Sequence, residues 1–172
     1  MSGYSRPRPV QPVPVRIIGI DPGSRVTGYG VIEKDGHRLG FVTCGTIRTE
    51  KEKDFSRRLL VIFEGLSEVM ELHQPEVAAV EDLFVAHNPR SALKLGQARG
   101  TAVVAAMKQG LTVHDYSPRM IKQAVAGYGQ AQKEQVQHMV RALLELSGSP
   151  SSDAADALAV AICHANHMDR LL

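Results

Sequence analysis

Four acidic side chains of this sequence stand apart from its other charged residues. Asp21 and Glu81 each end a short apolar run, and Asp153 and Asp156 lie three residues apart at the start of a long apolar stretch. Residues at this spacing share one face of a helix. Carboxylates gathered in one place repel one another and lose hydration unless a cation neutralises them. The pattern therefore indicates a metal site.

The ligand type indicates which metal. Carboxylate oxygens are hard ligands that suit Mg²⁺ or Mn²⁺, and no paired thiol or histidine spacing typical of zinc accompanies them. Two such ions, about 3.5 to 4 Å apart, can hold the attacking water and the leaving oxygen of a phosphodiester. A structural role remains open for Asp153 and Asp156, because Ser149, Ser151 or Ser152 could cap a helix whose dipole favours acids in its first turn.

The first third of the chain predicts three antiparallel strands. Residues 15–21 form a nearly continuous apolar run that ends at Asp21. Strands at 28–33 and 39–47 follow, joined by a turn at Asp35 and Gly36, two residue types that tolerate positive φ. Short connections of this kind predict an antiparallel meander.

The remainder alternates helices with strands. Apolar residues at three- and four-residue steps predict a helix from Phe55 to Met70 that ends before Pro75. The further predicted elements are a strand at 76–81, a helix at 90–109, a strand at 111–116, a helix from Pro118 to the glycines at 127–129, and helices at 133–146 and 153–168. This order predicts an α/β fold with a mixed five-stranded sheet, helices on both faces and a site where strands end.

Length and composition set the broad class. The chain has 172 residues, of which 44% are hydrophobic, which suits one compact domain. We expect residues 1–15 to form a disordered, proline-rich tail and residues 16–172 to form the domain. No secretory signal and no apolar stretch of about 20 residues is present, so we expect a soluble, cytoplasmic protein with no membrane partner. A net charge of +2 permits nucleic-acid binding without arguing for it.

Four segments, in this order, resemble the RuvC family of bacterial Holliday-junction resolvases. The likeness runs from about Ile17 to His167, which is nearly the whole chain outside the tail. The segments are G-I-D-P-G-S-R-V-T-G-Y-G, V-E-D-L-F-V-A-H-N-P-R-S-A-L-K-L-G-Q-A-R-G, K-E-Q-V-Q-H-M-V-R-A-L-L and D-A-A-D-A-L-A-V-A-I.

The resemblance implies an RNase H-like fold and a homodimeric endonuclease of homologous recombination and DNA repair. Such an enzyme makes paired, symmetric, Mg²⁺-dependent nicks in a four-way DNA junction and leaves ligatable 5′-phosphate and 3′-hydroxyl ends. The catalytic and metal-binding quartet of the family falls on Asp21, Glu81, Asp153 and Asp156. Two Mg²⁺ ions per subunit are implied, with Mn²⁺ as a substitute. A contact with a RuvAB branch-migration complex is raised by the resemblance but not decided by any residue.

The resemblance also implies contacts with DNA. Phe84 would stack on unpaired bases at the junction centre, although a core position is the alternative. Lys122 and Lys133 match positions that contact the DNA backbone near the active site, whereas lone lysines more often only solubilise a surface. Asp82 departs from the family pattern and adds a fifth carboxylate at the rim of the site. Further phosphate contacts are predicted for Arg90, Lys94 and Arg99.

Several small residues fit the same interpretation. We expect Gly28 and Gly30 to leave a strand surface that a DNA backbone can approach closely. Ala92, Gly96 and Gly100 recur at four-residue steps and predict a smooth helix face. That face could pack on the sheet of its own subunit or lie near a dimer interface.

Other functions remain open. The strand, aspartate and glycine-rich turn G-I-D-P-G-S also resemble the start of the actin, Hsp70 and sugar-kinase ATPases, but these need two domains of this type and the chain has room for one. A nuclease of the same fold acting on RNA or RNA–DNA hybrids is a second alternative. A module that binds branched DNA without cutting it is a third, disfavoured because acids without a metal repel phosphate.

Overall fold

The computed structural model describes residues 13–82 and 88–169, so most of the expected tail and Phe84 lie outside the described residues. A single sheet has the strand order β3-β2-β1-β4-β5, with the first three strands antiparallel and β4 and β5 parallel to β1. The strands are β1 (Val15–Asp21), β2 (Val26–Asp35), β3 (Arg38–Arg48), β4 (Val77–Glu81) and β5 (Thr112–Tyr116). The predicted mixed sheet is confirmed.

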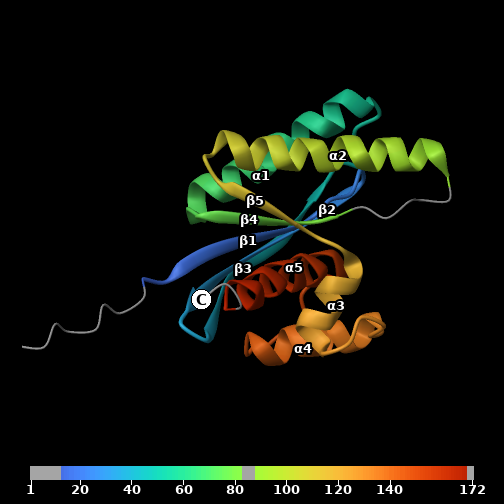
Figure 1. Cartoon of the computed structure of the whole chain (residues 1–172). Coiled ribbons are helices and arrows are strands. Elements are labelled where there is room, and N and C mark those ends of the chain that lie inside the picture. The colour runs from blue at the N-terminus through green and yellow to red at the C-terminus, as the bar shows by residue number, and fades with distance from the viewer. Residues whose placement is uncertain (1–12, 83–87, 170–172) are drawn as a thin grey trace, which may run out of the picture.

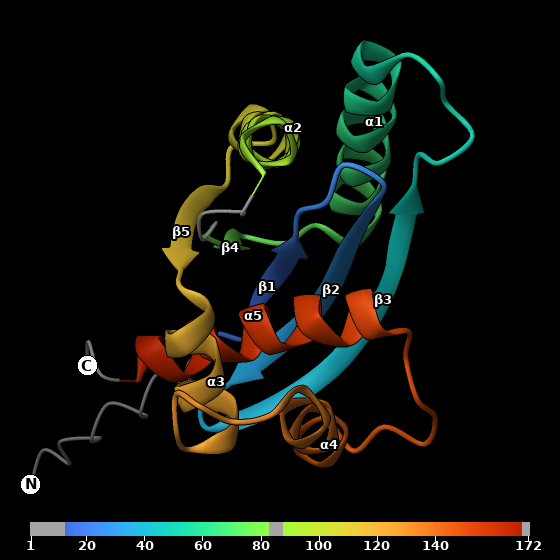
Figure 2. The ribbon, with the colours of Figure 1, turned by 90° about the vertical axis from the view of Figure 1, so that its right-hand side faces the viewer.

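Helices cover both faces of this sheet (Figures 1 and 2). α1 (Phe55–His73) and α2 (Pro89–Lys108) pack side by side on one face. α5 (Ser152–Met168) crosses the other face, and α3 (Pro118–Ala126) and α4 (Lys133–Leu143) pack outside it. The predicted α/β class and each predicted helix are therefore confirmed.

The helix α4 ends earlier than predicted. The apolar pattern extends to Leu146, whereas α4 ends at Leu143. Glu145 has φ of 52°, in the left-handed region, which a continuing right-handed helix cannot include. The chain therefore turns here and leads into α5.

Glycines on the sheet allow α5 to lie directly on the strands. A Cβ atom at Gly19 would stand 2.1 Å from the carbonyl oxygen of Ala157, and one at Gly28 would stand 2.1 Å from that of Asp153. Gly30 faces the same helix. The expectation that Gly28 and Gly30 leave room for DNA is thus wrong, because a helix of the same chain occupies that surface. Their lack of side chains brings α5 onto the ends of β1 and β2.

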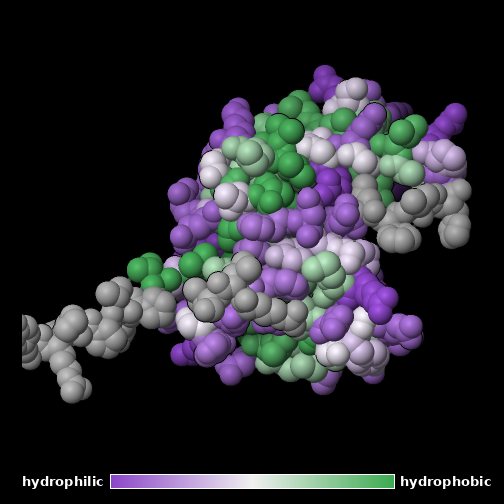
Figure 3. Space-filling view, in the orientation of Figure 1, coloured by the Kyte–Doolittle hydropathy of each residue, from purple (hydrophilic) through white to green (hydrophobic). Residues whose placement is uncertain are grey.

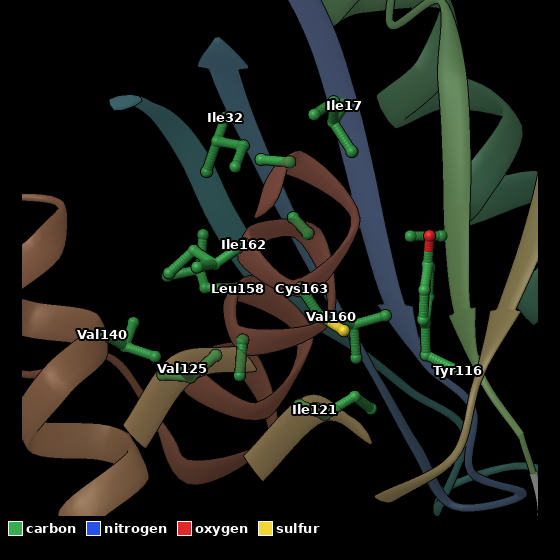
Figure 4. Packing of buried hydrophobic residues seen from close by; sticks show 14 of the residues in the cluster. Ile17, Ile32, Tyr116, Ile121, Val125, Val140, Leu158, Val160, Ile162 and Cys163 are labelled. Carbon is green, nitrogen blue, oxygen red and sulfur yellow. The ribbon is translucent and has the colours of Figure 1, made fainter. Parts of the chain in front are cut away.

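The remainder of α5 is core. Leu158 and Ile162 are fully buried and pack with Ile17 of the sheet and with Ile121 and Val140 from the two outer helices (Figure 4). Removing this apolar surface from water is the main force holding the layers together. Within residues 13–82 and 88–169, no helix combines the length and apolarity needed to cross a bilayer.

Candidate active site

The parallel pairing of β1 and β4 brings two acids together. Asp21 is the last residue of β1 and Glu81 the last of β4, and the register pairs Ile20 with Val80 one residue earlier. The two carboxyl groups are hydrogen-bonded to each other. The predicted convergence of these two strand ends is therefore confirmed.

The start of α5 adds the other two acids, with Asp153 in its first turn and Asp156 just after it. The side chain of Ser151 caps this helix by accepting a backbone N–H of the first turn at 3.4 Å, as one of the predicted caps. Gly28 pairs with Asp21 across β1 and β2 and lies beneath the backbone of Asp153. The helix start is thereby held over the end of β1, where the charges of Asp153 and Asp156 act on Asp21.

The electrostatics of this cluster are unfavourable in the metal-free protein. Burial, the hydrogen bond and charge of Glu81, and then the charges of Asp156 and Asp153 raise the pKa of Asp21 to about 9. Burial is also the main cause that raises the pKa of Glu81, partly offset by the hydrogen bond from Asp21. At neutral pH Asp21 therefore holds a proton in the metal-free protein, and its carboxyl group can become a ligand only when that proton leaves.

Two lysines face the acids across a cleft of about 200 Å³. The ammonium of Lys133 lies 2.9 Å from a carboxylate oxygen of Asp156, and Lys122 and Lys133 both oppose the rise in the pKa of Glu81. The cleft is lined by Glu81, Asp156, Lys122 and Lys133 over a floor that includes Ile121 and Val136. Two cations beside four acids form a surface that can receive a phosphate next to carboxylates.

A divalent cation fits this donor set in type but not yet in arrangement. The four carboxylates offer only oxygen ligands, the type that Mg²⁺ and Mn²⁺ prefer. Among the described residues, no three acidic, histidine or cysteine side chains are already placed to hold an ion together. Asp156 is engaged by Lys133 and Asp21 by Glu81. Metal binding would require both contacts to open.

The structure gives Arg99 partners within the chain. Its guanidinium pairs with Asp115 on β5 and lies 3.7 Å from Asp82, measured from Nε to the carboxylate. Its side chain is only 22% exposed. A phosphate contact by Arg99 would have to compete with two carboxylates, and Asp82 is held toward α2 rather than standing alone at the rim.

The other predicted DNA contacts lie at or near the start of α2. Arg90 is exposed, and its backbone N–H donates to the capping side chain of Asn88. The ammonium of Lys94 lies over the ring of Phe55, 5.6 Å from its centre. The phosphate contacts of Arg90 and Lys94 therefore stay predictions, as does the stacking role of Phe84.

Two buried threonines that the sequence analysis missed hold the loop after Asp21. The hydroxyl of Thr27 donates to the carbonyl of Gly23 at 2.9 Å and accepts the N–H of the same residue at 3.3 Å. The hydroxyl of Thr49 donates to the carbonyl of Ser24 at 2.7 Å. A polar residue inside an apolar strand, as at Thr27, is the sequence signal that could have indicated this bracing.

The mixed sheet, with acids at the ends of β1 and β4 and at the start of a helix laid across it, defines an RNase H-like fold with acidic side chains gathered at one edge of the sheet. A family model described as crossover junction endodeoxyribonuclease RuvC matches residues 17–164. The chain belongs to this family.

Individual relatives agree with the family match. The protein named crossover junction endodeoxyribonuclease RuvC from Geobacter sulfurreducens is 57% identical over 152 residues, which are 88% of this chain and 93% of the relative. The protein of the same name from Citrifermentans bemidjiense is 59% identical over 150 residues, covering 87% and 92%. A solved structure of Thermus thermophilus RuvC in complex with Holliday junction substrate has a TM-score of 0.86 and 36% identity, covering 91% of this chain and 96% of that one.

Proposed function

We propose that this chain is an endonuclease that resolves four-way DNA junctions, with Asp21, Glu81, Asp153 and Asp156 as its catalytic and metal-binding residues. The observation that carries the proposal is the meeting of four carboxylates at the ends of β1, β4 and the start of α5, in a member of a junction-endonuclease family. The solved complex of Thermus thermophilus RuvC with a Holliday junction supports the choice of substrate.

The four carboxylates would hold two Mg²⁺ ions, or Mn²⁺, which when bound supply a nucleophilic water and stabilise the leaving 3′-oxygen. The residues of the chain do the rest. Lys122 and Lys133 attract the scissile phosphate into the cleft, and its apolar floor excludes water from behind it. Products would carry 5′-phosphate and 3′-hydroxyl ends, which a ligase can join.

The alternatives are less well supported. An actin-like or Hsp70-like ATPase is not favoured, because the RuvC family model covers residues 17–164 of this single domain. A nuclease of RNA or RNA–DNA hybrids shares the fold but not the family name of the relatives. A module that binds junctions without cutting them would not need the clustered acids, which repel phosphate when no metal is bound.

The direct test compares substrates. Purified protein is incubated with a four-way junction, a linear duplex and an RNA–DNA hybrid, with Mg²⁺ and with EDTA. We expect paired nicks in the junction alone, in Mg²⁺ alone, and their loss in Asp153→Asn while junction binding persists. Glu134→Gln, which removes an exposed acid outside the quartet, should cut normally. Equal cutting of the linear duplex would overturn the substrate, and full activity of Asp153→Asn would overturn the site.

An exposed apolar face on α2 supports a homodimer. Leu93, Val104 and Met107 are 69%, 58% and 58% exposed, and Figure 3 shows hydrophobic side chains gathered over this helix. A Cβ atom added at Gly96 or Gly100 would meet no described atom within 4 Å, so this smooth face does not pack on the sheet of its own subunit. We propose that two copies pair through it, which would give one site for each of two symmetric nicks.

Solution size tests the dimer. We expect Val104→Glu to shift the protein from dimer to monomer in analytical ultracentrifugation and to abolish paired nicking. Leu72→Glu, on the α1 surface and 74% exposed, is the matched control and should remain dimeric. A monomeric wild-type protein would contradict the proposal.

The remaining family expectations stay proposals. Phe84→Ala should impair cleavage more than binding if the ring stacks on junction bases. Chromosomal DNA as substrate would place the enzyme in the cytoplasm. A RuvAB partner could be tested by co-sedimentation, although no described residue is assigned to that contact.

A further inference from the structure

The placement of Lys133 has an effect beyond attracting phosphate. Lys133 is the first residue of α4, where a capping box of Gln132 and Gln135 fixes the helix start. From there its side chain reaches across the cleft, so that the ammonium lies 2.9 Å from Asp156. The lysine side chain is 56% exposed and that of Asp156 27%, so the contact is open to an incoming ligand.

We propose that Lys133 couples DNA binding to metal binding, because its ammonium holds Asp156 in the free protein and moves to a DNA phosphate when substrate enters the cleft. Asp156 then becomes available as a metal ligand. This inference rests on the proposed function, since it assigns Asp156 to the metal site and DNA to the cleft.

Charge balance gives the physical reason. The ammonium interacts with Asp156 first and also with Asp153, so a single positive charge partly neutralises two acids beside the protonated Asp21. A divalent ion at the same carboxylates must displace that charge, and two cations this close repel each other. The displaced ammonium needs an anion, and the substrate supplies one as phosphate. Free protein should therefore bind metal weakly and DNA-bound protein more tightly.

Lys122 provides the contrast. It lines the same cleft from α3, yet no described carboxylate lies within ion-pair distance of it. Its charge repels a metal ion only at longer range. If Lys133 acts through its contact with Asp156, the two lysines must affect metal affinity unequally.

Linkage makes the coupling measurable from either side, because whatever factor DNA adds to metal affinity, metal adds to DNA affinity. We would titrate Mn²⁺ into the full chain by calorimetry, free and bound to a pre-nicked junction in which no bond remains to be cut. The variants are Lys133→Met, Lys133→Arg and Lys122→Met.

For the free protein, Lys133→Met should raise Mn²⁺ affinity about fivefold, the upper range for a partly exposed ion pair. Lys133→Arg should keep the wild-type value, and Lys122→Met should change it by less than Lys133→Met does. Binding to the nicked junction should increase the Mn²⁺ affinity of wild type more than that of Lys133→Met. The two increases should differ by the same factor of about five. Thermal melting without metal checks that each variant is folded.

Equal increases in the two Met variants would show a general charge effect and overturn the proposal, as would unchanged affinity in Lys133→Met. Should Lys133→Met fail to fold, wild type alone decides, since equal Mn²⁺ affinity with and without the nicked junction excludes any coupling. Absence of junction cutting by wild type would instead overturn the proposed function and leave the lysine measurement valid.

Discussion

The two ends of α5 carry polar side chains in opposite electrical situations. In its first two turns, Asp153 and Asp156 add negative charge next to Asp21, whose pKa burial already raises. Near its other end, His164 is buried but neutral, because burial lowers its pKa to about 4, and its Nδ1 is hydrogen-bonded to the hydroxyl of Tyr116 at 2.7 Å. Negative charges repel one another at the start of the helix, whereas the buried histidine near its end is neutral and hydrogen-bonded.

The residue after α5 continues this contrast. Asp169 accepts from the ammonium of Lys34 at 2.7 Å, and the same ammonium donates to the carbonyl of Gly36 at 2.6 Å. These bonds hold the end of α5 to the hairpin of β2 and β3. Polar groups that are fully paired within the chain indicate stability, whereas charges left uncompensated indicate a ligand still to come.

The strongest way to sharpen this comparison is Asp21→Asn. The amide can still donate a hydrogen bond to Glu81 and, unlike the carboxyl group of Asp21, takes up no proton on folding at neutral pH, so the metal-free protein should melt at a higher temperature. Junction cleavage should fall by roughly 10³-fold or more, the scale on which loss of one catalytic group acts. Cleavage assays and metal-free melting measure the two effects. A variant that is both inactive and less stable would show that Asp21 supports the fold rather than straining it.

Packing beneath α5 gives the next largest effect. Gly19→Ala would drive a methyl group into the backbone of α5 at Ala157, and overpacking of this kind should lower the free energy of unfolding by about 1 to 3 kcal/mol. Gly148→Ala is the matched control, because a Cβ there meets no described atom within 4 Å. Urea unfolding of both variants measures the difference. Equal stability of the two would mean that α5 can lift from the sheet without loss.

These glycines also show where sequence reasoning stops. The strands, helices and acidic quartet follow from local patterns, since apolar periodicity and a carboxylate at a strand end are visible residue by residue. The sequence predicts a close approach of another group at Gly28, because this residue has no side chain. It does not tell whether that group is a DNA backbone or a helix of the same chain. The alanine-rich start of α5, A-A-D-A-L-A, is the complementary signal, because two small-residue surfaces pack closely on each other.

Contacts between particular side chains could not be predicted from the sequence for a related reason. Lys133 and Asp156 are adjacent only because α4 and α5 pack together, and Arg99 meets Asp115 only because α2 lies beside β5. Such contacts depend on side-chain directions set by the whole fold. A resemblance can name a lysine near the site but cannot state which acid it touches.

A moderate effect is expected at the far end of α5. Tyr116→Phe removes the hydroxyl that is hydrogen-bonded to Nδ1 of His164 and leaves a buried nitrogen without its partner, which should lower stability by about 1 to 2 kcal/mol. Burial raises the pKa of Tyr116 to about 12, so the hydroxyl stays protonated at neutral pH and the bond is present throughout. Urea unfolding measures the loss. Cleavage of the junction should not change, and a loss of cleavage would mean that the two ends of the helix are not separate in function.

The pH dependence of stability differs in sign between the two ends, and the smallest expected effect is the one at Asp169. Asp21 has a raised pKa, so the folded protein binds more protons than the unfolded chain, and metal-free stability should fall as pH rises from its ordinary pKa of 3.8 toward about 9. The hydrogen bond from Lys34 is the main cause that lowers the pKa of Asp169. Its contribution to stability is therefore full above its ordinary pKa of 3.8 and is lost as pH falls through the folded value.

Urea unfolding across this range, for wild type and Asp169→Asn, isolates the second contribution. The variant should be slightly less stable at neutral pH, since Lys34 keeps its bond to the carbonyl of Gly36, and the difference should vanish in acid. High salt should reduce it, because the carboxylate is partly exposed. If the difference in stability instead grew as pH falls, the ionised carboxylate of Asp169 would not be the form that stabilises the fold. The contrast between the two ends of α5 would then be wrong.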